Sequence, residues 1–314
     1  MAAHHHHHRH HVDPTSGDRR VILAVAVNLG LTIAQFVGGL VSGSLALVAD
    51  AVHNFSDAVS LIIAFAARRI ARRPSDARMT FGYGRAEIVA ALINYTSLII
   101  IGLYLVIEAI GRFVDPQGVD GWIVVFIAGL ALVVDVVTAL LTWSLSRESV
   151  NIRAAFLHNV ADALGSVAVI VAGTLILLYD WRLVDPIVTL MIAAYILWQS
   201  FAEIGPVIRI LMNGSPVDVT GTDVVARMRA VEGVRDVHQA HLWQMQERVS
   251  ALDAHVVIEE GAWDRADAIK ARVKALLVEE FGIGHAMIEL ECSRHACRDA
   301  PVFGHHAARP AHDH

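Results

Sequence analysis

The sequence predicts a multi-pass α-helical membrane protein, with six transmembrane helices and a C-terminal α+β domain outside the bilayer. Of the 314 residues, 55% are hydrophobic and only 18% are charged, and the mean hydropathy is +0.51, which argues against an ordinary soluble protein. Half of the Asp, Glu, Lys and Arg residues lie from Arg209 onward, so an apolar body carries a soluble end. The net charge of −6 removes the basic surface that a nucleic-acid-binding protein needs, and we expect no nucleic acid among the partners.

Six apolar runs justify the membrane helices. Each is long enough, at ~1.5 Å per residue, to cross a hydrocarbon core of ~30 Å. The first two runs are separated only by the turn Ser42-Gly43-Ser44 and read as a hairpin. The runs cover residues 21–41, 44–67, 86–111, 121–146, 154–179 and 183–206.

The distribution of arginine predicts the orientation. The link between the second and third spans contains six arginines, and the segment before the first span contains three more. On the opposite side only Arg112 and Arg182 occur. Positive charge favours the cytoplasmic side, so we expect both termini in the cytoplasm and a multi-pass protein of the inner membrane. The short link between spans four and five, at 146–151, favours a bacterial type.

After span six the sequence takes on the character of a soluble domain. The hydrophobic patterns predict the element order αββαβ, with elements at residues 218–230, 235–244, 249–258, 264–281 and 286–292. The predicted division is a His-rich disordered tail (1–18), the transmembrane domain (19–208), a cytoplasmic metal-binding domain (209–296) and a second His-containing disordered tail (297–314).

The second and fifth spans contain the polar residues that point to chemistry. The pattern His-Asn-x-x-Asp-Ala occurs at His53 to Asp57 and again at His158 to Asp162. A step of four residues puts each His and its Asp on one helix face. If the two helices pack together, His53, Asp57, His158 and Asp162 supply four N/O ligands, which suits tetrahedral Zn²⁺.

Other readings of the same residues stay open at this stage. Buried polar side chains can pair helices, although two identical His/Asp pairs are a costly way to do so. A membrane metal hydrolase needs an open zinc position, which four protein ligands do not leave, and a channel needs weaker sites than a closed cage. A zinc-sensing membrane protein is a further alternative.

Four more polar residues of the spans are candidates for a second shell or a proton path. They are Asp50, Asn54, Asn159 and Asp135. Asp50 lies three residues before His53 on the same stripe and can accept a hydrogen bond from an imidazole. Helix packing is the competing role for such a residue.

The combination of motifs resembles the cation diffusion facilitators, in the branch with a His-x-x-x-Asp pair on each of two spans. It includes the stretches Ser44 to Asp50, Phe81 to Glu87 and Leu211 to Pro216 beside the two pairs, and it covers roughly residues 20–292. The resemblance implies a homodimeric zinc/proton antiporter with a cytoplasmic domain of metallochaperone-like fold. It also implies that the two His/Asp pairs form the transport site and that His at the first position favours Zn²⁺.

This sequence departs from the family pattern in two places. Some relatives bind a second metal through a His in the link between spans two and three, where this chain has Tyr83, so we expect that site to be absent. A Lys to Asp charge interlock of relatives matches Arg85 and Asn213, so we expect it to be weak or replaced.

Further histidines and cysteines suggest metal binding outside the bilayer. The resemblance implies regulatory zinc on His238, His255, His285 and Glu291, although histidines are common on surfaces. Cys292 and Cys297 could form a separate soft-ligand site. The N-terminal run is either a purification tag or a zinc-capturing tail, and the histidines near the C-terminus favour the tail; it contains His4, His5, His6, His7, His8, His10 and His11.

The ligand types predict a mechanism as well. Zinc requires neutral imidazole and ionised carboxylate, so loading the site expels protons and reprotonation weakens metal binding. The sequence therefore predicts a secondary transporter, not an enzyme, whose partners are zinc ions, protons, the lipid bilayer and a second copy of the chain.

Overall fold

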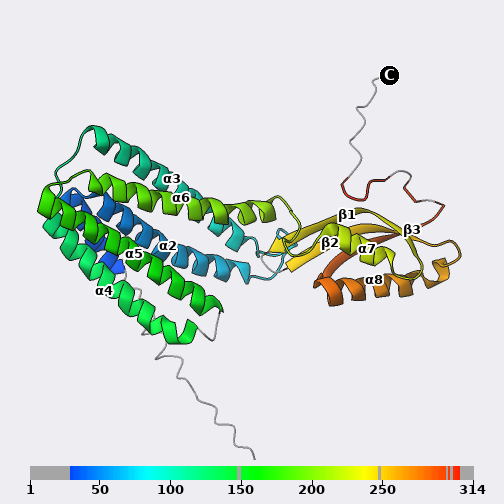
Figure 1. Ribbon diagram of the computed structural model, residues 1–314. Helices are drawn as coiled ribbons and strands as arrows, with labels where there is room; N and C mark the ends of the chain where they lie inside the picture. The colour runs from blue at the N-terminus through cyan, green and yellow to red at the C-terminus, as the bar shows by residue number, and fades with distance from the viewer. Residues whose placement is uncertain (1–28, 147–149, 247–248, 295, 298–299, 305–314) are drawn as a thin grey trace, which may run out of the picture. The chain divides into compact units, whose positions relative to one another are not determined.

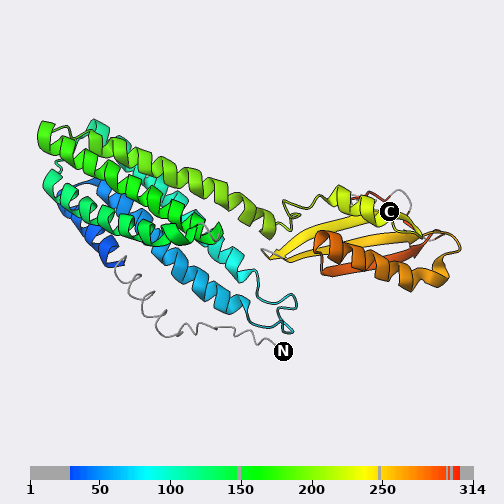
Figure 2. The same cartoon turned by 60° about the horizontal axis from the view of Figure 1, so that its bottom comes forward.

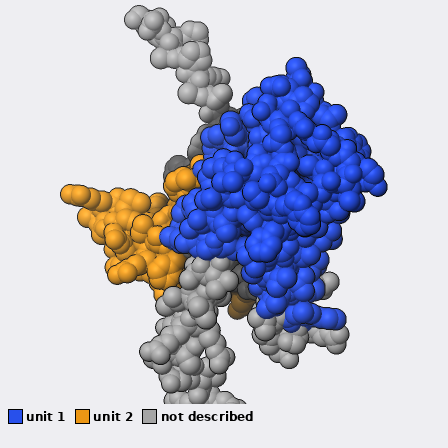
Figure 3. All heavy atoms as spheres, turned by 90° about the vertical axis from the view of Figure 1, so that its left-hand side faces the viewer, with its two compact units in different colours: residues 1–63, 94–202 blue, residues 64–93, 203–314 orange. Residues whose placement is uncertain are grey.

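The computed structural model describes residues 29–146, 150–246, 249–294, 296–297 and 300–304. The chain divides into two compact units, which Figure 3 colours separately. One unit holds residues up to Ile63 together with Asn94–Ala202, and the other holds Ala64–Ile93 together with the residues from Glu203 onward. The first unit contains most of the helical bundle, and the second contains the sheet.

Five helices are long and apolar enough to cross a membrane, as the sequence predicts. The apolar helix over Leu29–Ser42 corresponds to the end of the first predicted span, whose residues 21–28 lie outside the described part. The long helices, labelled in Figure 1, are α2 (Leu45–Ala71), α3 (Ala86–Val114), α4 (Gly121–Ser146), α5 (Val150–Tyr179) and α6 (Val184–Leu211).

Local signals set where these helices begin and end. Gly43 has a φ of 74°, and the Ser44 hydroxyl after it accepts a hydrogen bond from Leu47 N at 3.1 Å, which caps α2. Asp120 caps α4 in the same way, by accepting from Trp122 N and Ile123 N. Helix α6 continues to Leu211, five residues beyond the predicted span, and so crosses the predicted domain boundary at 208.

Large apolar side chains cover the outside of the bundle. Ile107, Phe126 and Trp198 are at least 70% exposed. A water-soluble monomer rarely exposes so much contiguous apolar surface, whereas a bilayer solvates it. Small residues fill the inside, since Ala46, Ala128 and Ala193 are fully buried.

The C-terminal domain has the predicted αββαβ order. Its elements are α7 (Gly221–Arg229), β1 (Val234–Gln246), β2 (Val249–Ile258), a short 3₁₀ turn (Trp263–Arg265), α8 (Ala266–Phe281) and β3 (His285–Cys292). The sheet order is β1-β2-β3, with β1 antiparallel and β3 parallel to β2. Figures 1 and 2 show α7 and α8 beside the sheet.

The core of this domain lies between the two helices and one face of the sheet. Val224, Ile269 and Leu277 of the helices pack with Ala254 and Val256 of β2 and with neighbouring apolar residues. Because side chains alternate along a strand, residues next to these, such as His255, lie on the opposite face. That face carries the candidate metal ligands.

The segment after β3 differs from its prediction. The sequence predicts disorder from residue 297, but the described residues 300–303 lie against β1. Gln239 N donates to Pro301 O at 2.9 Å and Ala240 N donates to Val302 O at 2.8 Å. Gln239 has a φ of 47° at a register shift in β1, so the irregular strand turns these amides outward to a new partner. We call residues 300–303 the C-terminal strap.

We predict that Leu277→Ala destabilises the C-terminal domain by about 2–5 kcal/mol, because Leu277 is completely buried and truncation leaves a cavity. Its neighbour Val278 is 52% exposed, so Val278→Ala is the matched control and should cost under about 0.5 kcal/mol. Hydrogen exchange of the β1 and β2 amides in the full chain measures both. Equal protection in the two variants would contradict this packing.

Candidate transport and metal sites

Helices α2 and α5 bring the four predicted transport ligands together. His53 Nε2 lies 3.4 Å from Asp162 Oδ1, and His158 Nε2 lies 3.1 Å from Asp57 Oδ2. Within each helix the His to Asp distances are 3.7 Å and 3.5 Å. Each carboxylate is therefore within 4 Å of both imidazoles, and ligand atoms of His53, Asp57 and Asp162 lie within 4.8 Å of one another.

The site lacks the internal hydrogen bonds that would satisfy it. Both ring nitrogens of His53 and Oδ1 of Asp162 are buried and have no hydrogen-bond partner among the described residues. Leaving buried polar atoms unpaired is costly, so these atoms are suited to a cation that bonds to them. Two carboxylates would neutralise a divalent ion, and the geometry fits the predicted zinc site.

The two halves of the site differ in exposure. The side chains of His53 and Asp162 are 9% and 10% exposed, whereas those of Asp57 and His158 are 32% and 36% exposed. Asp57 lies one turn further toward the C-terminal end of α2 than His53, and His158 lies one turn closer to the N-terminal end of α5 than Asp162. The site is therefore more open toward those helix ends.

The second-shell candidates lie in two separate contacts. Asp50 accepts a hydrogen bond from Gln35 Nε2 at 2.6 Å, and Asn54 donates to Gln35 Oε1 at 3.2 Å. All three residues are buried, so Gln35 joins the segment 29–42 to α2. Asp135 of α4 accepts from Ser166 of α5 at 3.0 Å. Asn159 is half-buried beside His158.

Sequence reasoning missed Tyr195 of α6. Its ring meets the His53 ring edge-on, with the centroids 6.0 Å apart. A single aromatic residue in an apolar span gives no signal of proximity to a ligand, because aromatic side chains are ordinary components of such helices. The contact limits the orientations that His53 can take.

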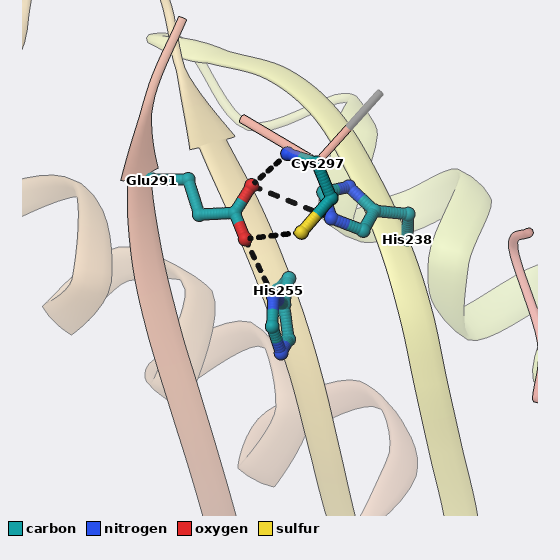
Figure 4. A group of neighbouring side chains, drawn as sticks. All are labelled: His238, His255, Glu291 and Cys297. Carbon is teal, nitrogen blue, oxygen red and sulfur yellow. Dashed lines mark hydrogen bonds and ion pairs between the residues drawn. The ribbon is translucent and has the colours of Figure 1, made fainter. Parts of the chain in front are cut away.

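A second cluster lies on the open face of the sheet, and Figure 4 shows its four side chains. His238 of β1 and His255 of β2 are paired in register, and Glu291 comes from β3. Cys297 follows β3 and completes a group whose ligand atoms all lie within 4.8 Å of one another.

Glu291 is at the centre of this cluster. Its carboxylate lies 2.6 Å from His255 Nδ1 and 3.4 Å from His238 Nε2, and it accepts from the Cys297 backbone N at 3.2 Å. Burial opposes ionisation and is the largest single influence on this carboxyl. The hydrogen bonds from His255 and Cys297 and the nearby His238 together outweigh it, so the pKa of Glu291 is lowered. The nearby Glu291 charge raises the pKa of the Cys297 thiol. His238 Nε2 is buried without a hydrogen-bond partner in the described chain, which fits a metal ligand.

Two predicted metal residues lie outside this cluster. His285 is at the opposite end of β3, where its ring meets Phe81 edge-on at 6.2 Å. Cys292 ends β3 and is not among the four residues of this group, whereas Cys297, the second cysteine of the predicted soft site, is. The N-terminal histidines lie outside the described residues.

The link between α2 and α3 is held by hydrogen bonds. The Tyr83 hydroxyl donates to Asp76 Oδ2 at 2.8 Å, and Arg78 N and Met79 N donate to Asp76 Oδ1. Tyr83 therefore ties the loop where some relatives are expected to use a His and a metal. Arg85 donates hydrogen bonds to Asn213 Oδ1 and to Met245 O. At the positions where relatives form a Lys to Asp ion pair, this chain therefore has a charge-assisted hydrogen bond.

Comparison with known proteins identifies the family. Residues 21–212 match the family model described as "Cation efflux transmembrane domain", and residues 216–292 match "Cation efflux protein, cytoplasmic domain". The chain belongs to the cation efflux family. The resemblance to cation diffusion facilitators, which is the same family, is thereby confirmed.

Several relatives align with this cation efflux protein over most of its length. The "Zinc transporter ZitB" of Pectobacterium atrosepticum is 36% identical over 89% of this chain and 87% of its own length. The "Cadmium, cobalt and zinc/H(+)-K(+) antiporter" of Bacillus subtilis is 33% identical over 88% of this chain and 90% of its own. A solved "Metal-bound C-terminal domain of the CzcD transporter" is 28% identical over 24% of this chain and 99% of its own, with a TM-score of 0.22.

These matches settle the class of protein. The family and the named relatives are transporters, so this cation efflux protein is a metal-cation transporter and not an enzyme. The hydrolase alternative, which the four-ligand site already disfavoured, is thereby set aside.

The Asp76 turn should depend on pH. Donation by Met79 N, the Tyr83 hydroxyl and Arg78 N lowers the pKa of Asp76. A lowered pKa stabilises the turn fully above the ordinary Asp pKa of about 3.9, and the stabilisation disappears as the pH falls through the lowered value. We expect Tyr83→Phe to raise the pKa of Asp76 and to shift this loss to higher pH. Carboxyl titration by NMR in labelled protein measures it, and an unchanged Asp76 titration would contradict the contact.

Proposed function

We propose that this cation efflux protein exports Zn²⁺ from the cytoplasm in exchange for protons by alternating access, and so provides zinc homeostasis or resistance. The observation that carries the proposal is the pairing of two His/Asp sets across α2 and α5, in which buried atoms of His53 and Asp162 have no hydrogen-bond partner among the described residues. Two imidazoles and two carboxylates suit tetrahedral zinc, and relatives named zinc transporters align with this chain over most of its length.

Proton exchange follows from the same ligands. Zinc binds neutral imidazole and ionised carboxylate, so an arriving ion displaces protons from the site, and protons arriving from the other side displace zinc. Asp50 lies about one turn before His53 on α2, and Asp135 lies on the neighbouring helix α4. These two acids are our candidates for passing the protons. Asn54 and Asn159, each adjacent to a ligand histidine, belong to the surrounding shell.

The difference in exposure between the four side chains supports a site that faces the cytoplasm. Asp57 and His158 are the more exposed of the four residues. On each helix they lie one turn closer than His53 and Asp162 to the end that the arginine distribution assigns to the cytoplasm. With both termini on that side, the C-terminal domain would be in the cytoplasm of a cell whose inner membrane holds the helices.

The C-terminal cluster would bind regulatory zinc in a homodimer. His238, His255, Glu291 and Cys297 offer two nitrogens, an oxygen and a sulfur within 4.8 Å, which suits Zn²⁺ or a softer divalent ion. The N-terminal histidines would collect zinc near the entrance. Homodimer formation is supported by the match to the family's cytoplasmic domain.

Transport is tested in proteoliposomes loaded with a proton gradient. We expect gradient-driven zinc flux in the wild type and a loss of about a hundredfold or more in Asp57→Asn and Asp162→Asn, because each removes one negative ligand from a site in a low-dielectric bundle. The exposed Asp115→Asn is the control and should keep wild-type flux. Zinc that binds the wild type without crossing the bilayer would refute transport and favour a sensor.

The C-terminal site is tested by calorimetry on full chains that carry Asp57→Ala and Asp162→Ala, so that the transport site is silent. There, Cys297→Ser should weaken zinc binding by about tenfold or more, equivalent to about 1.4 kcal/mol. Cys292→Ser is the matched control and should leave the affinity unchanged. Equal effects of the two substitutions would remove Cys297 from the site.

A further inference from the structure

A buried cluster at the beginning of α2 has no role in the transport chemistry described above. Asp185, at the start of α6, is only 1% exposed. Its carboxylate accepts hydrogen bonds from the Ser44 hydroxyl at 2.5 Å, from Leu45 N at 2.8 Å and from Ala46 N at 3.3 Å. Two of these donors are backbone amides of the first turn of α2, which have no partner within their own helix.

Helix α3 completes the cluster. Arg112 Nη1 lies 3.5 Å from Asp185 and also donates to Gly43 O, in the turn before α2. The guanidinium thus balances the buried carboxylate and grips the chain on the other side of Ser44. The side chain of Arg112 is 17% exposed, so solvent weakens this ion pair little. Three helices are joined at one point, through charged hydrogen bonds that are costly to break.

Outside the His/Asp site, the described contacts from the rest of α2 to neighbouring segments include the Gln35 contacts, a neutral hydrogen bond from Ser60 and an exposed pair between Arg68 and Glu87 at 3.8 Å. The first turn of α2 is therefore the part of the helix that a buried, fully hydrogen-bonded carboxylate holds against other helices. The transport ligands follow on the same helix, His53 at about 13 Å and Asp57 at about 20 Å from Ser44 at ~1.5 Å per residue.

We propose that Asp185 is a positioning residue for transport, which with Ser44 and Arg112 holds the first turn of α2 against α6 and α3 and makes it the pivot about which α2 moves His53 and Asp57. This inference rests on the proposed zinc transport. A rotation of about 10° about that point displaces His53 by about 2 Å and Asp57 by about 3 Å, given the helix rise. Metal–ligand distances in a working site vary by only about ±0.2 Å. A small rotation of α2 therefore separates the four ligands, while the first turn of α2 keeps its contacts with α6 and α3.

The first experiment compares Asp185→Ala with Asp180→Ala, an exposed acid of the adjacent turn that pairs with Arg182. Zinc flux is expressed per molecule with a zinc-binding transport site. These molecules are counted by calorimetry in detergent, as the binding lost when Asp57→Ala and Asp162→Ala are added to the same chain. We expect Asp185→Ala to lower the maximal rate about tenfold or more and to change affinity by less than about threefold, since the ligands stay on intact helices. Asp180→Ala should match the wild type. A per-molecule rate for Asp185→Ala within about twofold of wild type overturns the proposal.

A second experiment separates a pivot from a merely stabilising bond. Ser44→Cys and Asp185→Cys are combined in a chain with Cys292→Ser and Cys297→Ser, so that oxidation can link only α2 to α6. If the first turn is a pivot, the disulfide replaces the lost hydrogen bonds, and the oxidised protein transports faster than the reduced one. Flux that oxidation lowers or leaves unchanged overturns the proposal, as does a failure of the pair to cross-link.

These tests distinguish the two levels of inference. If the wild type moves no zinc under a proton gradient, the proposed transport function fails, whatever the variants do. If the wild type transports and the oxidised pair is not faster than the reduced pair, only the pivot fails.

Discussion

The bundle is organised by the cost of placing charge in an apolar environment. Each ionisable group buried in the spans must find an opposite charge, a donor or a metal, because no water is at hand to solvate it. Asp185 meets this requirement with amides, a hydroxyl and an arginine, and Asp50 does so with the Gln35 amide. His53 and Asp162 lie 3.4 Å apart, but the ring nitrogens of His53 and Oδ1 of Asp162 have no hydrogen-bond partner among the described residues. Groups that are satisfied hold helices together, and those left unsatisfied are suited to a cargo.

The same reasoning explains what the sequence could predict. Six apolar runs and two His/Asp pairs at a spacing of four are local patterns, and local patterns determine helices and helix faces. They predicted five described spans and the convergence of α2 and α5. Because each His/Asp pair lies on one helix face, packing that face of α2 against that face of α5 brings all four side chains together. The αββαβ order was also accessible from local periodicity, since strands and helices of that length carry distinct patterns.

Residues brought together by irregular backbone were not predictable in this way. Cys297 reaches the histidines because the chain turns back after β3, and no spacing in the sequence encodes that turn. His285 was assigned to the metal site by resemblance, yet it begins the strand that Glu291 nearly ends, six residues and about 20 Å away at the usual strand rise. Tyr195 and Asp185 gave no signal either. An aromatic residue in a span and an acid at a helix start are ordinary, and only packing gives them neighbours.

The C-terminal strap has a further consequence for the sheet. In the order β1-β2-β3, strand β1 is an edge, and edge amides are ready to pair with any other extended chain. The strap occupies the amides of Gln239 and Ala240, at the irregular part of that edge. Without the strap, every copy of the protein would expose these edge amides of β1 to its neighbours in the membrane. Because the strap already pairs with these amides, another chain cannot add a strand there, directly beside the candidate metal ligand His238.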